Sequence, residues 1–339
     1  MNVLLPFLSS SLSFVFALFL LDQWRERRRS YQLIWTIGMA WYGISAGTEF
    51  WGDAFGWSEP LYRTWYLIGA VYVAAWLGLG TMYLLRKTRF GYAAAFSVLL
   101  AGLFTYLSQQ KAQYTDTGML PTIAFAVGVI GAIVICVETY RGTGRWAWIA
   151  GFLIIGGSIV AIPIVYGAAI PAPGYAVDAK GIPVGTLMPG SVRLLTPFFN
   201  VTGGFALALG ALFSTYIYMP KKRVLHYELG GLRGVLLLPW ALVAMTVNFL
   251  VSVPGAVAAL FAGRLHSRVP ATILLAIGGF IPSLTSGLSR FGITETFFLG
   301  ELLGVVFLFA GFLVSEEVFR EFRVPFTSRV LRSRRAEAA

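Results

Sequence analysis

Acidic side chains within strongly apolar stretches are the residues of this sequence best suited to chemistry. Glu49 and Asp53 lie four residues apart, a spacing that places both carboxylates on one face of a helix. A carboxylate at the depth of Glu49 is costly to bury and needs a partner, and Arg63, the next basic residue along the chain, is the predicted partner. This group predicts a site that binds a cation or exchanges a proton.

Three further polar residues are candidates for binding a substrate or an ion. Glu301 lies between two glycines four residues apart, a spacing that lets a second helix pack closely beside the acid. Asn248 precedes Pro254-Gly255, where an unwound backbone would offer carbonyl groups to a ligand. Asn200 begins a glycosylation sequon, but it lies inside an apolar stretch. We therefore regard it as a candidate polar ligand.

Several other kinds of chemistry are not indicated. A single cysteine, Cys136, allows no intrachain disulfide and no cluster of thiolate metal ligands. His226 and His266 lie in basic loops, which excludes a haem held by two intramembrane histidines. The phosphate-binding, dinucleotide-binding, zinc-protease and serine-hydrolase motifs are absent. We therefore expect no metal and no cofactor, and an enzyme is not favoured.

The composition indicates which elements position these residues. Hydrophobic residues make up 57% of the chain and charged residues 12%, and the mean hydropathy is +0.74, outside the range of soluble domains. With about 20 residues needed per crossing, the length suits an all-α membrane bundle. The net charge of +11 then reflects membrane orientation and attraction to anionic lipid headgroups, and no nucleic-acid partner is expected.

Ten apolar runs occupy 4–21, 32–52, 64–85, 91–107, 118–138, 146–169, 195–219, 236–263, 271–289 and 296–314. Of the 26 Lys and Arg residues, 21 fall in six clusters in alternate loops and in the C-terminal tail. If the run 236–263 enters and leaves on one side, all 21 lie in the cytoplasm and 5 lie outside, as membrane orientation favours. We predict nine crossings plus one broken, re-entrant segment, with the N-terminus outside and the C-terminus cytoplasmic. The alternative makes 271–289 the re-entrant segment.

The sequence divides into a seven-helix membrane block (1–219), a cytoplasmic linker (220–234), a three-segment membrane block (235–315) and a basic cytoplasmic tail (316–339). Within the first block, the triplet Leu61, Gly69, Thr81 aligns with Leu195, Gly203, Thr215 at a constant offset, which suggests a 3+1+3 parallel repeat. In plan this resembles the PQ-loop permeases and the rhodopsin-like seven-helix proteins. The Pro-Gln pair of the former and the retinal-binding lysine of the latter are absent.

These features predict a permease or ion-coupled carrier of a small solute in the plasma (inner cell) membrane. The alternatives are a non-transporting membrane sensor or accessory subunit of a membrane complex, and a lipid-modifying membrane enzyme. Expected partners are membrane lipids with anionic headgroups at the cytoplasmic face, and either a second copy of the chain or another membrane subunit.

Overall fold

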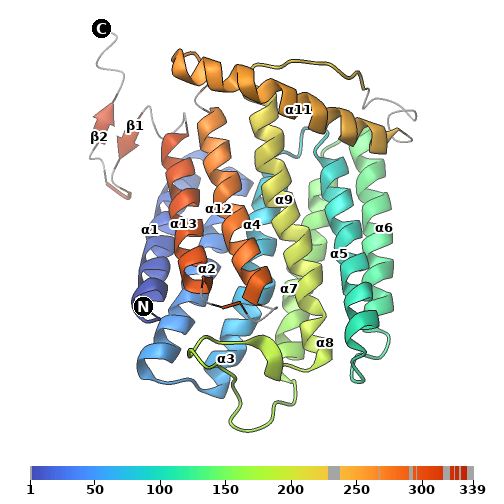
Figure 1. The fold of residues 1–339 in the computed structure, drawn as a ribbon, viewed down its shortest axis with the longest axis vertical. Helices are drawn as coiled ribbons and strands as arrows, with labels where there is room; N and C mark the ends of the chain where they lie inside the picture. Colours follow the sequence, from blue (N-terminus) through green and yellow to red (C-terminus); the bar gives the residue numbers. More distant parts are fainter. Residues whose placement is uncertain are drawn as a thin grey trace.

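The computed structural model describes residues 2–227, 237–266, 268–289, 293–294, 296–315, 321–323, 325–327 and 330–333. Long helices lie side by side along the vertical axis of Figure 1. They are α1 (Leu4–Arg27), α2 (Ser30–Phe55), α3 (Glu59–Trp65) continued by a π-helical segment (Tyr66–Tyr72) and α4 (Val73–Leu84), α5 (Gly91–Ala112), α6 (Leu120–Arg141), α7 (Trp146–Tyr166), α9 (Leu195–Tyr218), α12 (Arg268–Ser289) and α13 (Phe297–Val314).

The remaining elements are short or lie across the bundle. A 3-10 turn (Gly185–Leu187) and α8 (Gly190–Arg193) precede α9, and α11 spans Leu238–Phe261. Two short strands, β1 (Glu321–Arg323) and β2 (Val330–Ser333), pair antiparallel in the tail. Apart from this small pair, the architecture is helical, as the composition predicted.

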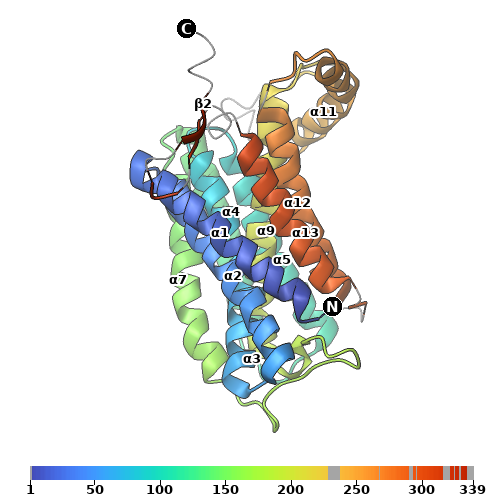
Figure 2. The ribbon, with the colours of Figure 1, turned by 90° about the vertical axis from the view of Figure 1, so that its left-hand side faces the viewer.

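Nine helices in the described part of the chain are long and apolar enough to cross a membrane, which fits a multi-pass membrane protein. One of the nine, 243–261 within α11, lies across one end of the bundle in Figures 1 and 2. Conversely, α2 carries Glu49 and Asp53, is not among the nine, and yet lies lengthwise within the bundle.

The prediction of a broken, re-entrant segment at 236–263 is wrong. α11 is one continuous helix that contains Pro254, and both of its ends lie at the same end of the bundle. Proline removes one backbone donor, and the helix is held in place by Asn248 and Ser252, which hydrogen-bond the extended segment 219–227 beside it. The alternative is also wrong, because α12 runs lengthwise beside α13.

The two ends of the bundle differ in charge. The described basic clusters flank the ends of α1, α4, α6, α9 and α12 that lie on the side of α11, whereas the N-terminus, α3 and α8 lie at the opposite end. We call the first the basic end and the second the N-terminal end. That the basic end faces the cytoplasm stays a prediction.

Glycines allow the central helices to approach closely. α3–α4 and α9 both start at the N-terminal end, so they run in parallel. A Cβ atom at Gly203 would lie 2.1 Å from the Ala74 carbonyl oxygen, and one at Gly78 would lie 2.3 Å from the Gly203 carbonyl oxygen. The parallel repeat and the division into two membrane blocks stay predictions. One apolar cluster joins helices of both blocks, with Leu207 of α9 and Leu308 of α13 among its members.

Candidate functional site

The structure brings together two acids that the sequence analysis found separately. Glu49 of α2 is completely buried, and its carboxyl group lies close enough to that of Glu301 of α13 for the two to interact electrostatically. Glu301 as a residue is half-buried, but its Oε2 atom is inaccessible to solvent. Neither Glu49 Oε2 nor Glu301 Oε2 has a hydrogen-bond partner among the described residues. We call these two residues the carboxyl pair.

Two buried carboxyl groups so close together favour a bound proton. The like charges of two ionised carboxylates repel strongly in a buried, weakly polarisable site. Two ionised carboxylates are also acceptors only, so they cannot hydrogen-bond each other. The arrangement is therefore most stable when the carboxyl pair holds at least one proton.

Aromatic side chains hold the two acids in place. The indole Nε1 of Trp65 donates to Glu49 Oε1 at 2.8 Å, and Glu49 Oε2 has no partner among the described residues. The Tyr42 hydroxyl donates to the backbone carbonyl of Glu301 at 2.9 Å. Directly after Trp65 the chain forms the π-helical segment Tyr66–Tyr72, a rare geometry that often marks functional sites.

The two glycines that flank Glu301 perform the predicted packing role. A Cβ atom at Gly300 would lie 2.3 Å from Thr285 Oγ1, and one at Gly304 would lie 2.2 Å from Pro282 Cγ. α12 therefore approaches α13 closely at the level of the acid. The carboxyl pair lies between α2 on one side and the tightly packed α12 and α13 on the other.

The predicted pairing of Arg63 with Glu49 is wrong. Arg63 binds Glu59 at 2.6 Å and donates to the carbonyls of Val165 and Ala168 at 2.6 and 2.8 Å. Arg63 and Trp65 are two residues apart and so face different sides of α3. The side with Trp65 faces Glu49, whereas the side with Arg63 faces the last turn of α7, where a cation satisfies free carbonyl groups.

The other predicted residues lie apart from the contact. Asp53 is one turn beyond Glu49, and its Oδ1 accepts a 3.2 Å hydrogen bond from Trp57 Nε1. Asn248, completely buried in α11, binds the backbone of Val224 and Leu225 at 2.7–2.9 Å, which is a structural role. Asn200 lies on α9, and its buried Oδ1 has no partner among the described residues.

A loop covers the N-terminal end near the carboxyl pair. Ile182 packs against Phe297 and Phe298, one turn before Glu301 on α13, with Leu5 beside them. Asp178 Oδ2 accepts a 2.6 Å hydrogen bond from Thr294, just before the same helix. The loop that the sequence places between the sixth and seventh predicted helices therefore forms a cover over the end of α13.

Sequence reasoning singled out both acids, but it did not place them next to each other. It also did not identify Trp65 and Tyr42 as the side chains that hold them in place. In the sequence Trp65 is one of several aromatic residues that follow Glu49, and neither it nor Tyr42 carries a signal of its own. Nothing in the local spacing links α2 to α13, which are separated by most of the chain. Within the described residues, no group of three or more His, Cys, Asp or Glu side chains is placed to hold a metal ion.

Comparisons with protein-family models, with curated proteins and with solved structures gave no match. The class that the fold and the site define is therefore a multi-pass-type helical bundle with a buried carboxyl pair between two helices.

Proposed function

We propose that the protein is an ion-coupled carrier of a small solute in the plasma (inner cell) membrane, and that the coupling ion is a proton bound by the carboxyl pair. The observation that carries this proposal is the proximity of the Glu49 and Glu301 carboxyl groups in the interior of an apolar bundle, with no described basic side chain to neutralise them. Ionisable residues at such depth are costly to bury and commonly mark proton or ion pathways.

Proton release would change the packing of α2 against α13. Loss of the shared proton leaves two negative charges in contact, and their repulsion is large where water is scarce. The two helices must then separate, admit water, or accept a cation between them. Proton binding at this contact is thus coupled to the distance between α2 and α13, as a proton-driven carrier needs.

The cover at the N-terminal end supports a gated path to the site. Ile182 and the two phenylalanines that begin α13 form an apolar contact one turn away from Glu301. Opening that contact would expose the carboxyl pair to water on this side, while closing it would seal the pair inside the bundle. A carrier that alternates its access requires such a closure on each side of its binding site.

A second candidate is a non-transporting sensor or accessory subunit. The observation in its favour is the extended segment 219–227, which is held against α11 and exposes Lys221, Lys222 and Arg223 at the basic end. A basic surface of this kind suits docking of an acidic partner protein. In that case the carboxyl pair would sense proton concentration without moving a solute. No observation favours the lipid-modifying enzyme.

The shared proton is tested by infrared spectroscopy of the purified protein. We expect an absorption band from a protonated carboxylic acid that shifts in Glu49→Gln and in Glu301→Gln and disappears in the double variant. Asp53→Asn is the matched control, because it removes a neighbouring carboxyl group outside the pair and should leave the band unchanged. A band that survives the double variant would refute the proton assignment.

Transport is tested in proteoliposomes that contain a pH-sensitive dye. Separate mixtures of amino acids, sugars and organic cations are added, and one mixture should drive proton movement in the wild type and in Asp53→Asn but not in Glu49→Gln. If the carboxylic acid band is present and no mixture moves protons, the sensor or subunit becomes the better assignment.

A further inference from the structure

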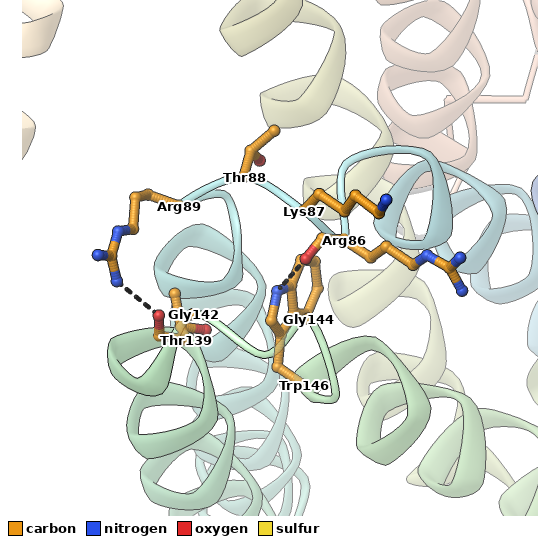
Figure 3. A pocket seen from close by; sticks show the side chains of 8 residues that line it. All are labelled: Arg86, Lys87, Thr88, Arg89, Thr139, Gly142, Gly144 and Trp146. Atoms are coloured by element: carbon orange, nitrogen blue, oxygen red, sulfur yellow. Dashed lines mark hydrogen bonds between the residues drawn. The ribbon is translucent and has the colours of Figure 1, made fainter.

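A pocket at the basic end lies outside the carboxyl pair and plays no part in the proposed transport. Its volume is about 280 Å³, and it lies between the turn that joins α4 to α5 and the turn that joins α6 to α7 (Figure 3). Eight residues line it: Arg86, Lys87, Thr88, Arg89, Thr139, Gly142, Gly144 and Trp146. Three of them are basic and none is acidic.

Two carbonyl groups in this pocket are already occupied. Trp146 Nε1 donates to the Arg86 carbonyl at 2.9 Å, and Arg89 Nη1 donates to the Thr139 carbonyl at 2.6 Å (Figure 3). The two turns are held together closely, since a Cβ atom at Gly144 would lie 2.9 Å from the Arg86 carbonyl oxygen. The charged side chains of the lining are all cationic, which favours an anion.

Two of the cations have no counter-charge among the described residues. Neither Arg86 nor Lys87 forms an ion pair there, and in Figure 3 both side chains extend to the same side of their turn, away from Arg89. Glu138, in the last turn of α6, is occupied by Arg141 at 2.8 Å and by Thr143 at 2.9 Å. The pocket therefore carries an unbalanced positive charge.

Apolar side chains lie exposed beside the pocket. Leu84, two residues before Arg86, is 41% exposed, and Trp148, two residues after Trp146, is 61% exposed. Such side chains on the outside of a membrane bundle face acyl chains. An anion that combines a phosphate group with acyl chains would match both parts of this surface.

From this combination we infer that the pocket binds the phosphate of an anionic lipid headgroup, with Arg86 and Lys87 as its cationic ligands. Basic pockets between the ends of membrane helices on the cytoplasmic side are a recognised kind of headgroup site. Arg89 has a structural part, since it closes the last turn of α6 through the Thr139 carbonyl. The inference depends on the orientation of the basic end but not on proton transport, so each proposal can fail without the other.

The test measures lipid binding to the full chain in detergent by native mass spectrometry. Phosphatidylglycerol, which is anionic, is compared with phosphatidylcholine, which is zwitterionic. We expect selective binding of phosphatidylglycerol that weakens by about fivefold for each charge removed, and so by about 25-fold in Arg86→Gln/Lys87→Gln. Added salt should weaken it as well, because exposed charges are screened.

Arg145→Gln is the matched control. Arg145 is an exposed arginine in the same turn as Gly144 but does not line the pocket. It should weaken phosphatidylglycerol binding by less than about twofold, since its charge is partly balanced by Glu138. An equal loss in Arg145→Gln and in the double variant would mean diffuse surface attraction and would overturn the pocket assignment.

A second arm distinguishes lipid from free phosphate. Inorganic phosphate and glycerol phosphate are added as competitors at matched ionic strength. The inference predicts that neither displaces phosphatidylglycerol at concentrations near that of the lipid, because they lack acyl chains. Displacement by glycerol phosphate at such concentrations, lost in the double variant, would assign the pocket to a soluble phosphate ester and refute the lipid.

Discussion

At the scale of single residues, Trp65 fixes the orientation of the Glu49 carboxyl group in the carboxyl pair. Its indole hydrogen occupies one oxygen of Glu49, whose carboxyl group interacts electrostatically with that of Glu301. An indole donates but does not accept or carry a proton. Trp65 therefore fixes the geometry of the site without exchanging its proton.

Replacement of Trp65 by phenylalanine should destabilise the protein by about 1–3 kcal/mol, because Glu49 Oε1 would stay buried without its donor. The measurement is thermal unfolding in detergent. Trp57→Phe is the matched control: it removes the same kind of donor from Asp53, which lies at the end of α2 and is partly exposed. Equal losses in the two variants would contradict a special role for the buried bond.

The sequence indicated which acids lie in the apolar interior, but it did not indicate their partners. Glu49 and Glu301 stand out because a carboxylate in an apolar stretch is costly wherever the chain takes it. The partner of each acid depends on which helices become neighbours and on the rotation of each helix. Sequence order pairs Glu49 with Arg63 as the next basic residue along the chain, whereas the rotation of α3 directs Arg63 to Glu59 and to the last turn of α7.

At the scale of elements, the contact between α4 and α9 depends on the absence of side chains. Gly78 and Gly203 bring the two backbones together, and no flexible side chain is present there to move aside. Close backbone approach at small residues is a common basis of helix association in membranes, where the hydrophobic effect between helices is weak.

Gly203→Ala should therefore lower the unfolding free energy by about 1–3 kcal/mol or more, because the added methyl group would overlap the Ala74 carbonyl oxygen. Gly156→Ala is the control, since it adds the same group to a helical glycine of α7 with open space around it. It should be neutral or stabilise by up to about 1 kcal/mol, the helix preference of alanine. Thermal unfolding of both variants in one detergent measures the difference.

α11 shows where reasoning at this scale fails. The charge distribution correctly placed both ends of the 236–263 segment at one end of the bundle. The Pro254-Gly255 pair predicts a break in the helix, and two halves that short cannot each cross a membrane. In the structure both ends of α11 lie at one end of the bundle because the helix is unbroken and lies across that end. Asn248 hydrogen-bonds it to the backbone of Val224 and Leu225. A charge count cannot distinguish these two arrangements.

At the scale of the whole molecule, the loop at the N-terminal end ties distant parts of the chain together. Asp178 accepts hydrogen bonds from Thr294 and from the backbone of Lys180 and Ile182. The Tyr62 hydroxyl donates to the Val184 carbonyl at 2.5 Å. Burial alone would raise the pKa of the Asp178 carboxyl, but these hydrogen bonds to its ionised form outweigh that effect and lower the pKa below its ordinary value of 3.8.

A carboxyl group with a lowered pKa in the folded state stabilises the fold above its ordinary pKa, and this stability is lost as the pH falls through the folded value. We expect the unfolding temperature of the wild type to drop between pH 5 and about pH 3 by more than that of Asp178→Asn, which cannot titrate. Thermal scans across this range measure the effect. Parallel curves for the two proteins would show that Asp178 does not anchor the loop.

The two ends of the bundle also make the orientation testable. Basic loops are retained in the cytoplasm, so the basic end should be protected in intact cells and the N-terminal end should be accessible. With Cys136 first replaced by serine, single cysteines are introduced by Ala179→Cys in the loop at the N-terminal end and by Thr143→Cys at the basic end, both at exposed positions. An impermeant maleimide should label the first in intact cells and the second only after permeabilisation.

The reverse pattern would invert the orientation, place the proposed headgroup site outside, and leave the carboxyl pair near the cytoplasmic face. Labelling of both positions in intact cells would contradict a bundle that separates two compartments.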